Sequence, residues 1–290
     1  FTLFQLLSAF TSQDKYTSIF GFPSRLNGGL LSQLAYLIIF GGVLINLTPQ
    51  KAKKIIYSVI ITALVVSLWG IPSHFGRDPS CFVLTGKLSS TCWQKDFDPT
   101  LRIFSTLGQP NWLASYLVLS LPITLSLAFI LKKRKARIFL IATSSLIFLA
   151  IILTNSRSGT IGAAIAILVF LILTGTKTIR SNIRTLALLT IIFTVITLFF
   201  AKGLTRRINN GIPPNANNQI VEQSNPLPNS PTESGVIRLI VWKGAIEIFK
   251  NNPVLGTGPE TFVSTYYLNR PTEHNQTSEW DFLYNKAHNE

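Results

Sequence analysis

The sequence predicts an all-α protein, a polytopic bundle of transmembrane helices with a long external loop that contains short helices. The chain of 290 residues is 47% hydrophobic and only 13% charged, whereas soluble proteins average about 25% charged residues. Its mean hydropathy is +0.37. Apolar segments recur at the length of ~17–25 residues that a bilayer-crossing helix needs. Between these segments, basic residues gather in the short connections.

We expect six spans in two stretches of chain separated by one long connection. They cover 30–47, 55–71, 112–131, 138–154, 159–174 and 185–201. Residues 1–29 are predicted to form an external or interfacial segment. Phe1 is not an initiator Met and the chain stops as abruptly at Glu290, so we expect an internal fragment of a longer protein, with further spans after the end.

Charge assigns a side to each connection. The short connections after the first, third and fifth spans are rich in Lys and Arg, which is typical of cytoplasmic loops. All 12 acidic residues lie in the other segments, 1–29, 72–110 and 202–290. We therefore expect a six-span membrane domain over 30–201, with 72–110 as an external loop and 202–290 as a large external region.

The net charge of +14 does not predict nucleic-acid binding. A nucleic-acid groove needs basic residues on one continuous face, and here they are scattered between spans. The predicted partner of the apolar surface is the lipid bilayer.

The two cysteines, Cys81 and Cys92, both lie in the predicted external loop 72–110. On that side of the membrane a disulfide can form. The alternative is two thiols that stay unpaired.

The last external region has two parts. Residues 208–235 are rich in Asn, Pro and Ser, a composition typical of a flexible linker. A helix is predicted over 236–250, with Ser234 as a plausible N-cap and a stop before Pro253. On a helical wheel, Arg238 falls on the apolar face beside Trp242 and Phe249.

Four arginines sit at or near the predicted external boundary: Arg25, Arg102, Arg157 and Arg238. Arg157 stands out because no Asp or Glu occurs from residue 99 to residue 221. Guanidinium groups stay ionised and bind phosphate oxygens through two parallel hydrogen bonds, which suits a lipid-diphosphate ligand. The alternative for each arginine is that it only reaches to lipid headgroups.

Other polar residues carry weaker signals. Asp96 and Asp98 could hold a divalent cation, although Asp98 before Pro99 is more typical of a helix N-cap. Asn111 is available as an N-cap for the third span. His288 is one of three predicted external histidines and could transfer a proton near neutral pH.

Several motifs, taken in order, resemble the O-antigen ligase and polysaccharide-polymerase superfamily of bacterial inner-membrane glycosyltransferases. They are Arg102 through Ala114, Thr154 through Gly159, Arg238-x-x-x-Trp242, Pro253-x-x-Gly256-x-Gly258 and Ala287-His288-Asn289. The resemblance implies transfer of a glycan from an undecaprenyl-diphosphate carrier to an acceptor hydroxyl on the periplasmic face, without nucleotide or metal.

By that resemblance, Arg157 would bind the diphosphate leaving group, Arg238 would assist it, and His288 would orient or deprotonate the acceptor. The partners would be a polyprenyl-diphosphate-linked glycan and an acceptor glycolipid or protein. Polymerases and protein O-oligosaccharyltransferases of the same superfamily remain alternatives. A transporter of the inorganic-carbon type is the alternative from another class, but it would need polar or broken helices at mid-membrane.

Overall fold

The computed structural model describes residues 2–23, 26–93, 98–200 and 234–287. All regular structure in these residues is helical, which confirms the all-α prediction. Among these residues, five helices are long and apolar enough to cross a membrane, whereas six spans were expected. The first expected span, 30–47, corresponds to α3 (Leu30–Asn46), an apolar helix of 17 residues that is shorter than the other five. The chain divides into two compact units. One, here called the bundle unit, is Thr48–Gly211; the other, here called the loop unit, comprises Phe1–Leu47 and Ile212–Glu290.

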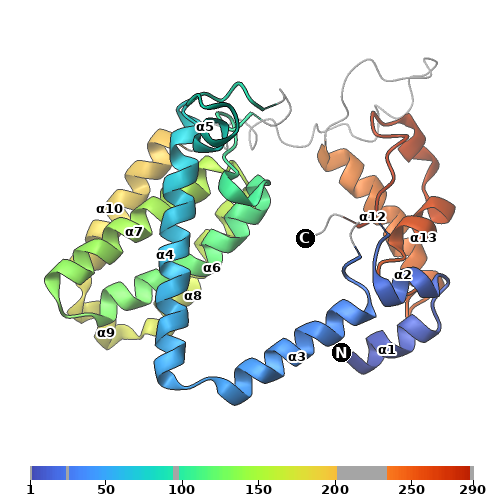
Figure 1. Cartoon of the computed structure of the whole chain (residues 1–290), viewed down its shortest axis with the longest axis horizontal. Coiled ribbons are helices and arrows are strands. Elements are labelled where there is room, and N and C mark those ends of the chain that lie inside the picture. Colours follow the sequence, from blue (N-terminus) through green and yellow to red (C-terminus); the bar gives the residue numbers. More distant parts are fainter. Residues whose placement is uncertain (1, 24–25, 94–97, 201–233, 288–290) are drawn as a thin grey trace. The chain divides into compact units, whose positions relative to one another are not determined.

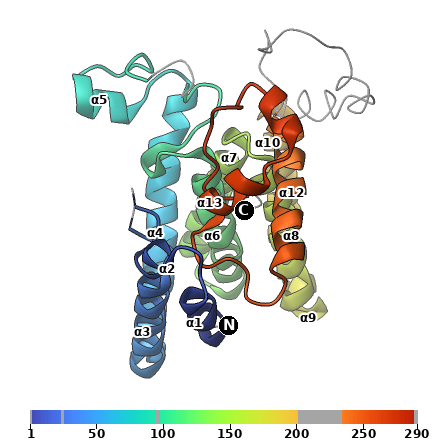
Figure 2. The same cartoon turned by 90° about the vertical axis from the view of Figure 1, so that its right-hand side faces the viewer.

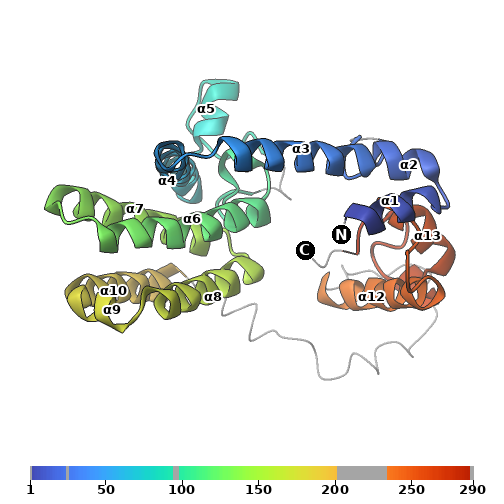
Figure 3. The same ribbon diagram turned by 90° about the horizontal axis from the view of Figure 1, so that it is seen from below.

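The bundle unit is an up-and-down arrangement of long helices (Figure 1). Its described elements are α4 (Pro49–His74), α5 (Pro79–Thr85), the 3-10 turn η2 (Ser105–Leu107), α6 (Pro110–Ile130), α7 (Arg134–Leu153), α8 (Arg157–Thr174), α9 (Thr176–Ser181) and α10 (Ile183–Phe200). Figure 3 shows three layers in this unit, with α6 and α7 between α4 on one side and α8 and α10 on the other.

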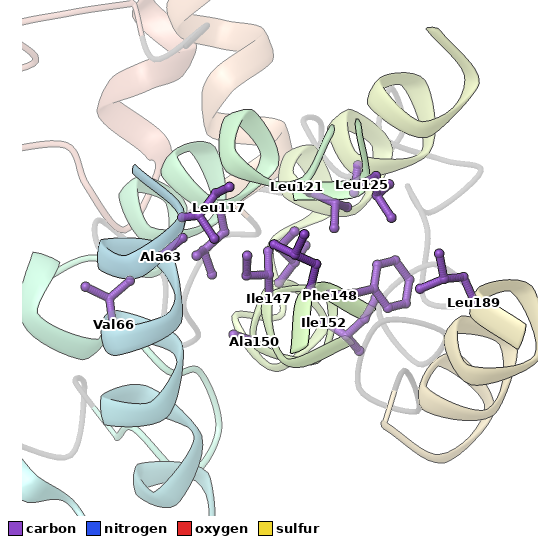
Figure 4. Packing of buried hydrophobic residues seen from close by; sticks show 14 of the residues in the cluster. Ala63, Val66, Leu117, Leu121, Leu125, Ile147, Phe148, Ala150, Ile152 and Leu189 are labelled. Atoms are coloured by element: carbon purple, nitrogen blue, oxygen red, sulfur yellow. The ribbon is translucent and has the colours of Figure 1, made fainter. Parts of the chain in front are cut away.

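The core of the bundle unit lies along α6 and α7, the central layer. Fully buried side chains include Leu117 and Leu121 of α6 and Ile147 and Ile151 of α7. Figure 4 shows this core between Ala63 of α4 and the outer helices. The outer helices α8 and α10 bury far less of their surface, as expected of helices that face lipid.

Helix ends follow local capping chemistry more closely than hydropathy. α4 begins at Pro49, six residues before the predicted span, because the Thr48 hydroxyl accepts a hydrogen bond from the Lys51 amide at 3.3 Å. Proline is favoured at the first helical position, where its missing N–H costs nothing. Lys51 therefore lies in the first turn of α4 rather than in a loop. Similarly, the predicted connection 132–137 ends inside α7, which begins at Arg134.

Antiparallel alternation gives the bundle unit two different ends. One end carries the start of α4, the α6–α7 connection and α9, and with them the Lys-rich and Arg-rich segments. At the other end α6 and α8 begin and α7 ends, and Arg102 and Arg157 lie there. This second end is called the arginine end below.

The loop unit contains α1 (Thr2–Phe10), α2 (Lys15–Phe20), α3, α12 (Ser234–Asn251), α13 (Phe262–Asn269) and the 3-10 turn η3 (Thr272–Gln276). Its small core consists of Ile237, Val241 and Ile248 of α12 packed on Tyr266 of α13 and on Tyr284. Gly244 allows this packing, since a Cβ there would meet the Tyr266 ring at 2.6 Å. The linker prediction for 208–235 falls almost wholly outside the described residues.

Candidate functional site

The arginine end of the bundle unit is built around the sharp reversal between α7 and α8. Asn155 makes the reversal with a φ of 49°, a left-handed conformation that Asn tolerates better than most residues. Ser156 is the N-cap of α8, and its hydroxyl accepts a hydrogen bond from the Gly159 amide at 3.2 Å. Arg157 is therefore the first helical residue of α8, and its side chain is exposed.

Asn111 connects this reversal to Arg102. The Asn111 side-chain carbonyl accepts hydrogen bonds from the Arg102 guanidinium at 3.1 Å and from the Ser156 hydroxyl at 2.9 Å. The Arg102 Nε atom donates to the Thr154 carbonyl at 3.1 Å. One amide oxygen thus joins the start of α6, the loop before it and the cap of α8.

Further hydrogen bonds fix the same loop against the end of α7 and against α4. The Ile103 amide donates to the Leu153 carbonyl at 3.2 Å, and the Asn155 side-chain amide donates to the Leu101 carbonyl at 2.8 Å. Ser105 donates its hydroxyl to the Val66 carbonyl of α4 at 2.7 Å. These bonds hold Arg102 to a defined place on the bundle.

α6 and α8 approach each other closely just below the arginines. A Cβ on Gly159 would lie 2.5 Å from the Cβ of Ala114, so the helices can meet at this distance only because residue 159 has no side chain. One turn further along α8, a Cβ on Gly162 would meet Val118 at an ordinary 3.5 Å. Of these two positions, the one next to the Arg157 turn has the closer approach of the two helices.

The electrostatic character of the arginine end is positive. Two arginines lie beside the N-termini of α6 and α8, where unpaired backbone N–H groups add partial positive charge. The nearby carboxylate in sequence, Asp98, accepts hydrogen bonds from the amide and the hydroxyl of Thr100 at 2.8 and 2.7 Å. Such an arrangement can bind an anion.

Two expectations about polar residues at this end are wrong. Asn111 does not cap α6: Gln109 occupies the cap position, Pro110 is the first helical residue, and the Asn111 side chain points to other partners. Asp98 does not cap a helix but a single turn, in which the Arg102 amide donates back to the Asp98 carbonyl. Pro110 takes the first helical position and leaves the cap to Gln109, and the chain after Asp98 makes one turn without continuing into a helix.

Cys81 and Cys92 form a disulfide with their Cα atoms 5.6 Å apart. Cys81 is fully buried in α5. Beside it, Asp78 caps α5 through the Ser80 amide and accepts the indole N–H of Trp93 at 2.7 Å. Covalent and hydrogen bonds thus hold together the segment that follows α4, from Asp78 to Trp93.

In the loop unit, Arg238 lies on the exposed side of α12, together with Trp242 and Phe249. The predicted apolar face of α12 is therefore not the buried one. The face that packs on α13 carries Ile237 and Val241. α12 has apolar residues on two sides. The helical wheel identified the side of Trp242 and Phe249, which remains exposed within the loop unit.

A buried histidine organises the segment that follows α13. His274 has no exposed surface; its Nδ1 lies 2.6 Å from the Tyr266 hydroxyl and its Nε2 lies 3.2 Å from the Glu279 carbonyl. A carbonyl oxygen only accepts, so Nε2 carries the proton and Nδ1 accepts from Tyr266. Burial lowers the pKa of His274 and raises that of Tyr266 to about 12.

Tyr284 extends this network towards Arg238. The Tyr284 hydroxyl donates to the Glu279 carboxylate, and its ring packs against His274 with centroids 5.3 Å apart. Burial and the Glu279 carboxylate raise the pKa of Tyr284, whereas the positive charge of Arg238 opposes that rise. The charge of Arg238 therefore acts on the pKa of Tyr284, a member of the buried aromatic network.

The Pro253 to Gly258 motif contacts the connection between α1 and α2. The Thr257 carbonyl accepts from the Gln13 amide at 3.3 Å and from the Ser12 hydroxyl at 3.2 Å. Gly258 has a φ of 117°, and a Cβ there would lie 2.2 Å from the Ser12 hydroxyl oxygen. Backbone conformation and close packing thus both favour glycine at residue 258, whereas at residue 256, with a φ of 65°, backbone conformation alone does.

The remaining predicted site residues fall outside the described part of the chain. These are Arg25, Asp96 and His288. The indole N–H of Trp242 donates to the carbonyl of Ala287 at 3.0 Å, and Ala287 directly precedes His288 in the sequence. In the described ranges, no cluster of three or more His, Cys, Asp or Glu residues could hold a metal ion.

Sequence reasoning missed two sets of residues. Asn111 was expected only to be a local cap and Ser156 was given no role of its own, and their meeting across 45 residues left no local signal. His274 was expected only to be one of the external histidines; its contact with Tyr266 joins the turn η3 to the helix α13, and no local pattern signals it.

Taken together, fold and site define a multi-pass membrane protein with a positively charged end on its helical bundle. The sequence pattern of the O-antigen ligase family matches residues 142–290, just over half of the chain. The chain belongs to that family. Comparisons with curated proteins and with solved structures gave no match.

Proposed function

We propose that the protein transfers a glycan from undecaprenyl diphosphate to an acceptor hydroxyl at the periplasmic face of the bacterial inner membrane, as an O-antigen ligase does. The observation that carries the proposal is the arginine end. There, Arg102 and Arg157 lie beside two helix N-termini, and Asp98 is engaged by its own turn. Membership of the O-antigen ligase family supports a lipid-linked glycan as the substrate.

Arg157 is assigned to the diphosphate. When the sugar leaves its carrier, the bond between the anomeric carbon and the diphosphate oxygen breaks, and that oxygen gains negative charge. A guanidinium group held at the first turn of α8 stabilises charge where it develops. The Ser156 cap and the Asn111 contacts fix that turn before substrate arrives.

Arg102, Arg25 and Arg238 are assigned supporting roles in substrate binding. Arg102 is held beside the start of α6 by its hydrogen bonds to Thr154 and Asn111. Arg238 is exposed on α12 and would assist the leaving diphosphate.

His288 is assigned to the acceptor. The acceptor oxygen forms the new bond to the anomeric carbon, and its proton passes to the imidazole, so the products are the glycosylated acceptor and undecaprenyl diphosphate. The hydrogen bond from Trp242 to the Ala287 carbonyl supports a role for this segment next to the Arg238 side of α12. The reaction as proposed uses neither a nucleotide nor a metal.

The polar residues inside the bundle favour an enzyme over a transporter. The hydroxyls of Ser67, Ser120, Thr124 and Thr143 each donate to the carbonyl four residues earlier in their own helix. In the described spans these hydroxyls are satisfied within their own helices. A polymerase or a protein O-oligosaccharyltransferase would use the same site with a different acceptor.

Alanine variants of Arg157 and His288 in the full-length protein test the proposal. Glycan attachment should fall at least ~100-fold for each, because a preorganised charged contact in a transition state contributes about 3–4 kcal/mol. Arg180→Ala, at the opposite end of the bundle, is the matched control and should leave the rate unchanged. Attachment at the wild-type rate in either test variant, at equal protein level, would reject the assigned role.

A chelator experiment tests the metal-independent chemistry. Activity should persist after exhaustive treatment with EDTA. Loss of activity that divalent cations restore would instead assign Asp96 and Asp98 as metal ligands.

A further inference from the structure

The short helix α5 and the loop after it expose an unusual run of apolar side chains. Phe82, Val83 and Leu84 are consecutive and are 54%, 70% and 69% exposed, and Leu88 is 57% exposed. No charged residue occurs from Pro79 to Gly86. In contact with water, four such side chains in one short stretch would be unfavourable.

The inner side of α5 is fully occupied by fixed contacts. The Trp69 indole of α4 donates to the Ser80 hydroxyl at 3.0 Å, and Cys81 is buried in its disulfide with Cys92. Asp78 caps the helix and holds Trp93. The exposed apolar side of α5 therefore has one fixed direction and cannot simply rotate inwards.

Figure 2 shows α5 extending sideways at the end of α4, away from α6 and α7. α4 presents an exposed apolar stripe of Ile61, Val65 and Leu68 along its length. Residues at these spacings share one face of a helix, and Trp69 lies next to that face. α5 is therefore attached at the edge of the surface that α4 presents to lipid.

The depth of α5 follows from the position of Trp69. This residue lies five positions before the end of α4 at His74, which corresponds to about 7.5 Å along the helix axis. Tryptophan is enriched at the membrane–water interface. Arg77 and Lys87, both exposed, flank α5 at the two ends where basic side chains can reach lipid phosphates.

We infer that α5 is a membrane anchor that lies in the bilayer interface at the His74 end of α4. Phe82, Val83 and Leu84 enter the acyl boundary, and Arg77 and Lys87 bind the phosphates of the headgroups. The Cys81–Cys92 disulfide holds the apolar side towards the lipid. This role is independent of glycan transfer, and its test does not use activity.

Spin labelling in proteoliposomes tests the inference. Val83→Cys and, separately, Leu84→Cys are labelled with a nitroxide in the full chain, with the Cys81–Cys92 disulfide intact. Collisions with oxygen, which concentrates among acyl chains, are compared with collisions with a water-soluble nickel chelate. Ser89→Cys, in the loop after α5, is the matched control.

For the labels at positions 83 and 84, the ratio of oxygen collisions to nickel-chelate collisions should be at least fivefold higher than for the label at position 89. Reduction of the disulfide should lower that ratio. A ratio equal to that of position 89 would place α5 in water and overturn the inference. Protection from both reagents would also overturn it, because a protein surface rather than lipid would then cover α5.

Discussion

Substituting Gly159 with alanine should damage both stability and catalysis through one contact. The added Cβ would lie 2.5 Å from the Cβ of Ala114, whereas two carbon atoms normally rest about 3.5–4.0 Å apart. α8 must therefore move away from α6 by about 1–1.5 Å at this turn. Overpacking of this kind costs about 1–3 kcal/mol.

The same displacement reaches Arg157, which lies two residues before Gly159. A misplacement of about 1 Å at a reacting centre can cost about 100-fold in rate. The assay is therefore double: thermal unfolding of the purified protein in detergent, and the rate of glycan transfer. Both should fall in the Gly159→Ala variant.

Two matched variants separate this contact from a general intolerance of alanine in α8. Gly162→Ala adds the same group one turn later, where the nearest atom is at 3.5 Å, and should leave both measurements within experimental error. Ala114→Gly in the Gly159→Ala background removes the clashing Cβ and should restore much of both. Unchanged stability and rate in Gly159→Ala, or no recovery in the double variant, would refute the reasoning.

Three further predictions concern other parts of the molecule. Asn111→Asp should leave the melting temperature unchanged or raised, because a carboxylate attracts the arginines. It should increase the KM for the lipid-linked donor about tenfold or more, because the same carboxylate repels a diphosphate. An unchanged KM would assign Asn111 a structural role only. The folded-state pKa of His274 lies below its ordinary value of 6.5, so unfolding takes up a proton below that pH. The free energy of unfolding, measured with denaturant, should therefore be flat above pH 6.5 and fall as the pH drops towards the lowered pKa. His274→Gln should abolish that dependence. Replacing both Cys81 and Cys92 with Ser should cost roughly 3 kcal/mol by the loop-entropy argument, and a reductant should then have no further effect on melting.

The membrane helices were predictable because their signal is local. A run of about 20 apolar residues identifies a span wherever it occurs, and five of the six predicted spans match α4, α6, α7, α8 and α10 to within a few residues at most ends. The remaining one, 30–47, coincides with the shorter apolar helix α3. The largest difference, at the start of α4, arises because the Thr48–Pro49 cap extends the helix through a lysine-rich turn. Hydropathy alone does not report a cap.

The contacts of Asn111 were not predictable from the sequence. Proline is favoured at the first helical position, so Pro110 places Asn111 inside the helix, and only the three-dimensional meeting with Arg102 and Ser156 gives Asn111 its role. The same limit applies to α12, which has apolar residues on two sides. Its buried side is decided by Tyr266, a partner on another helix.

The Gly256 and Gly258 motif illustrates the reverse case. The sequence carried a family pattern whose purpose was not evident from its spacing. The structure gives it a physical reason, since residue 258 combines a left-handed backbone with a position against Ser12 and Ser18 that a Cβ would fill.

The most direct test of the proposed function is binding of undecaprenyl diphosphate to the purified full-length protein and to its Arg157→Ala and Arg180→Ala variants. A charged hydrogen bond contributes about 1.5–3 kcal/mol, so the Kd of the Arg157→Ala variant should rise about 10- to 100-fold while that of Arg180→Ala stays at the wild-type value. Equal Kd values for all three proteins would contradict the assignment of Arg157 to the diphosphate.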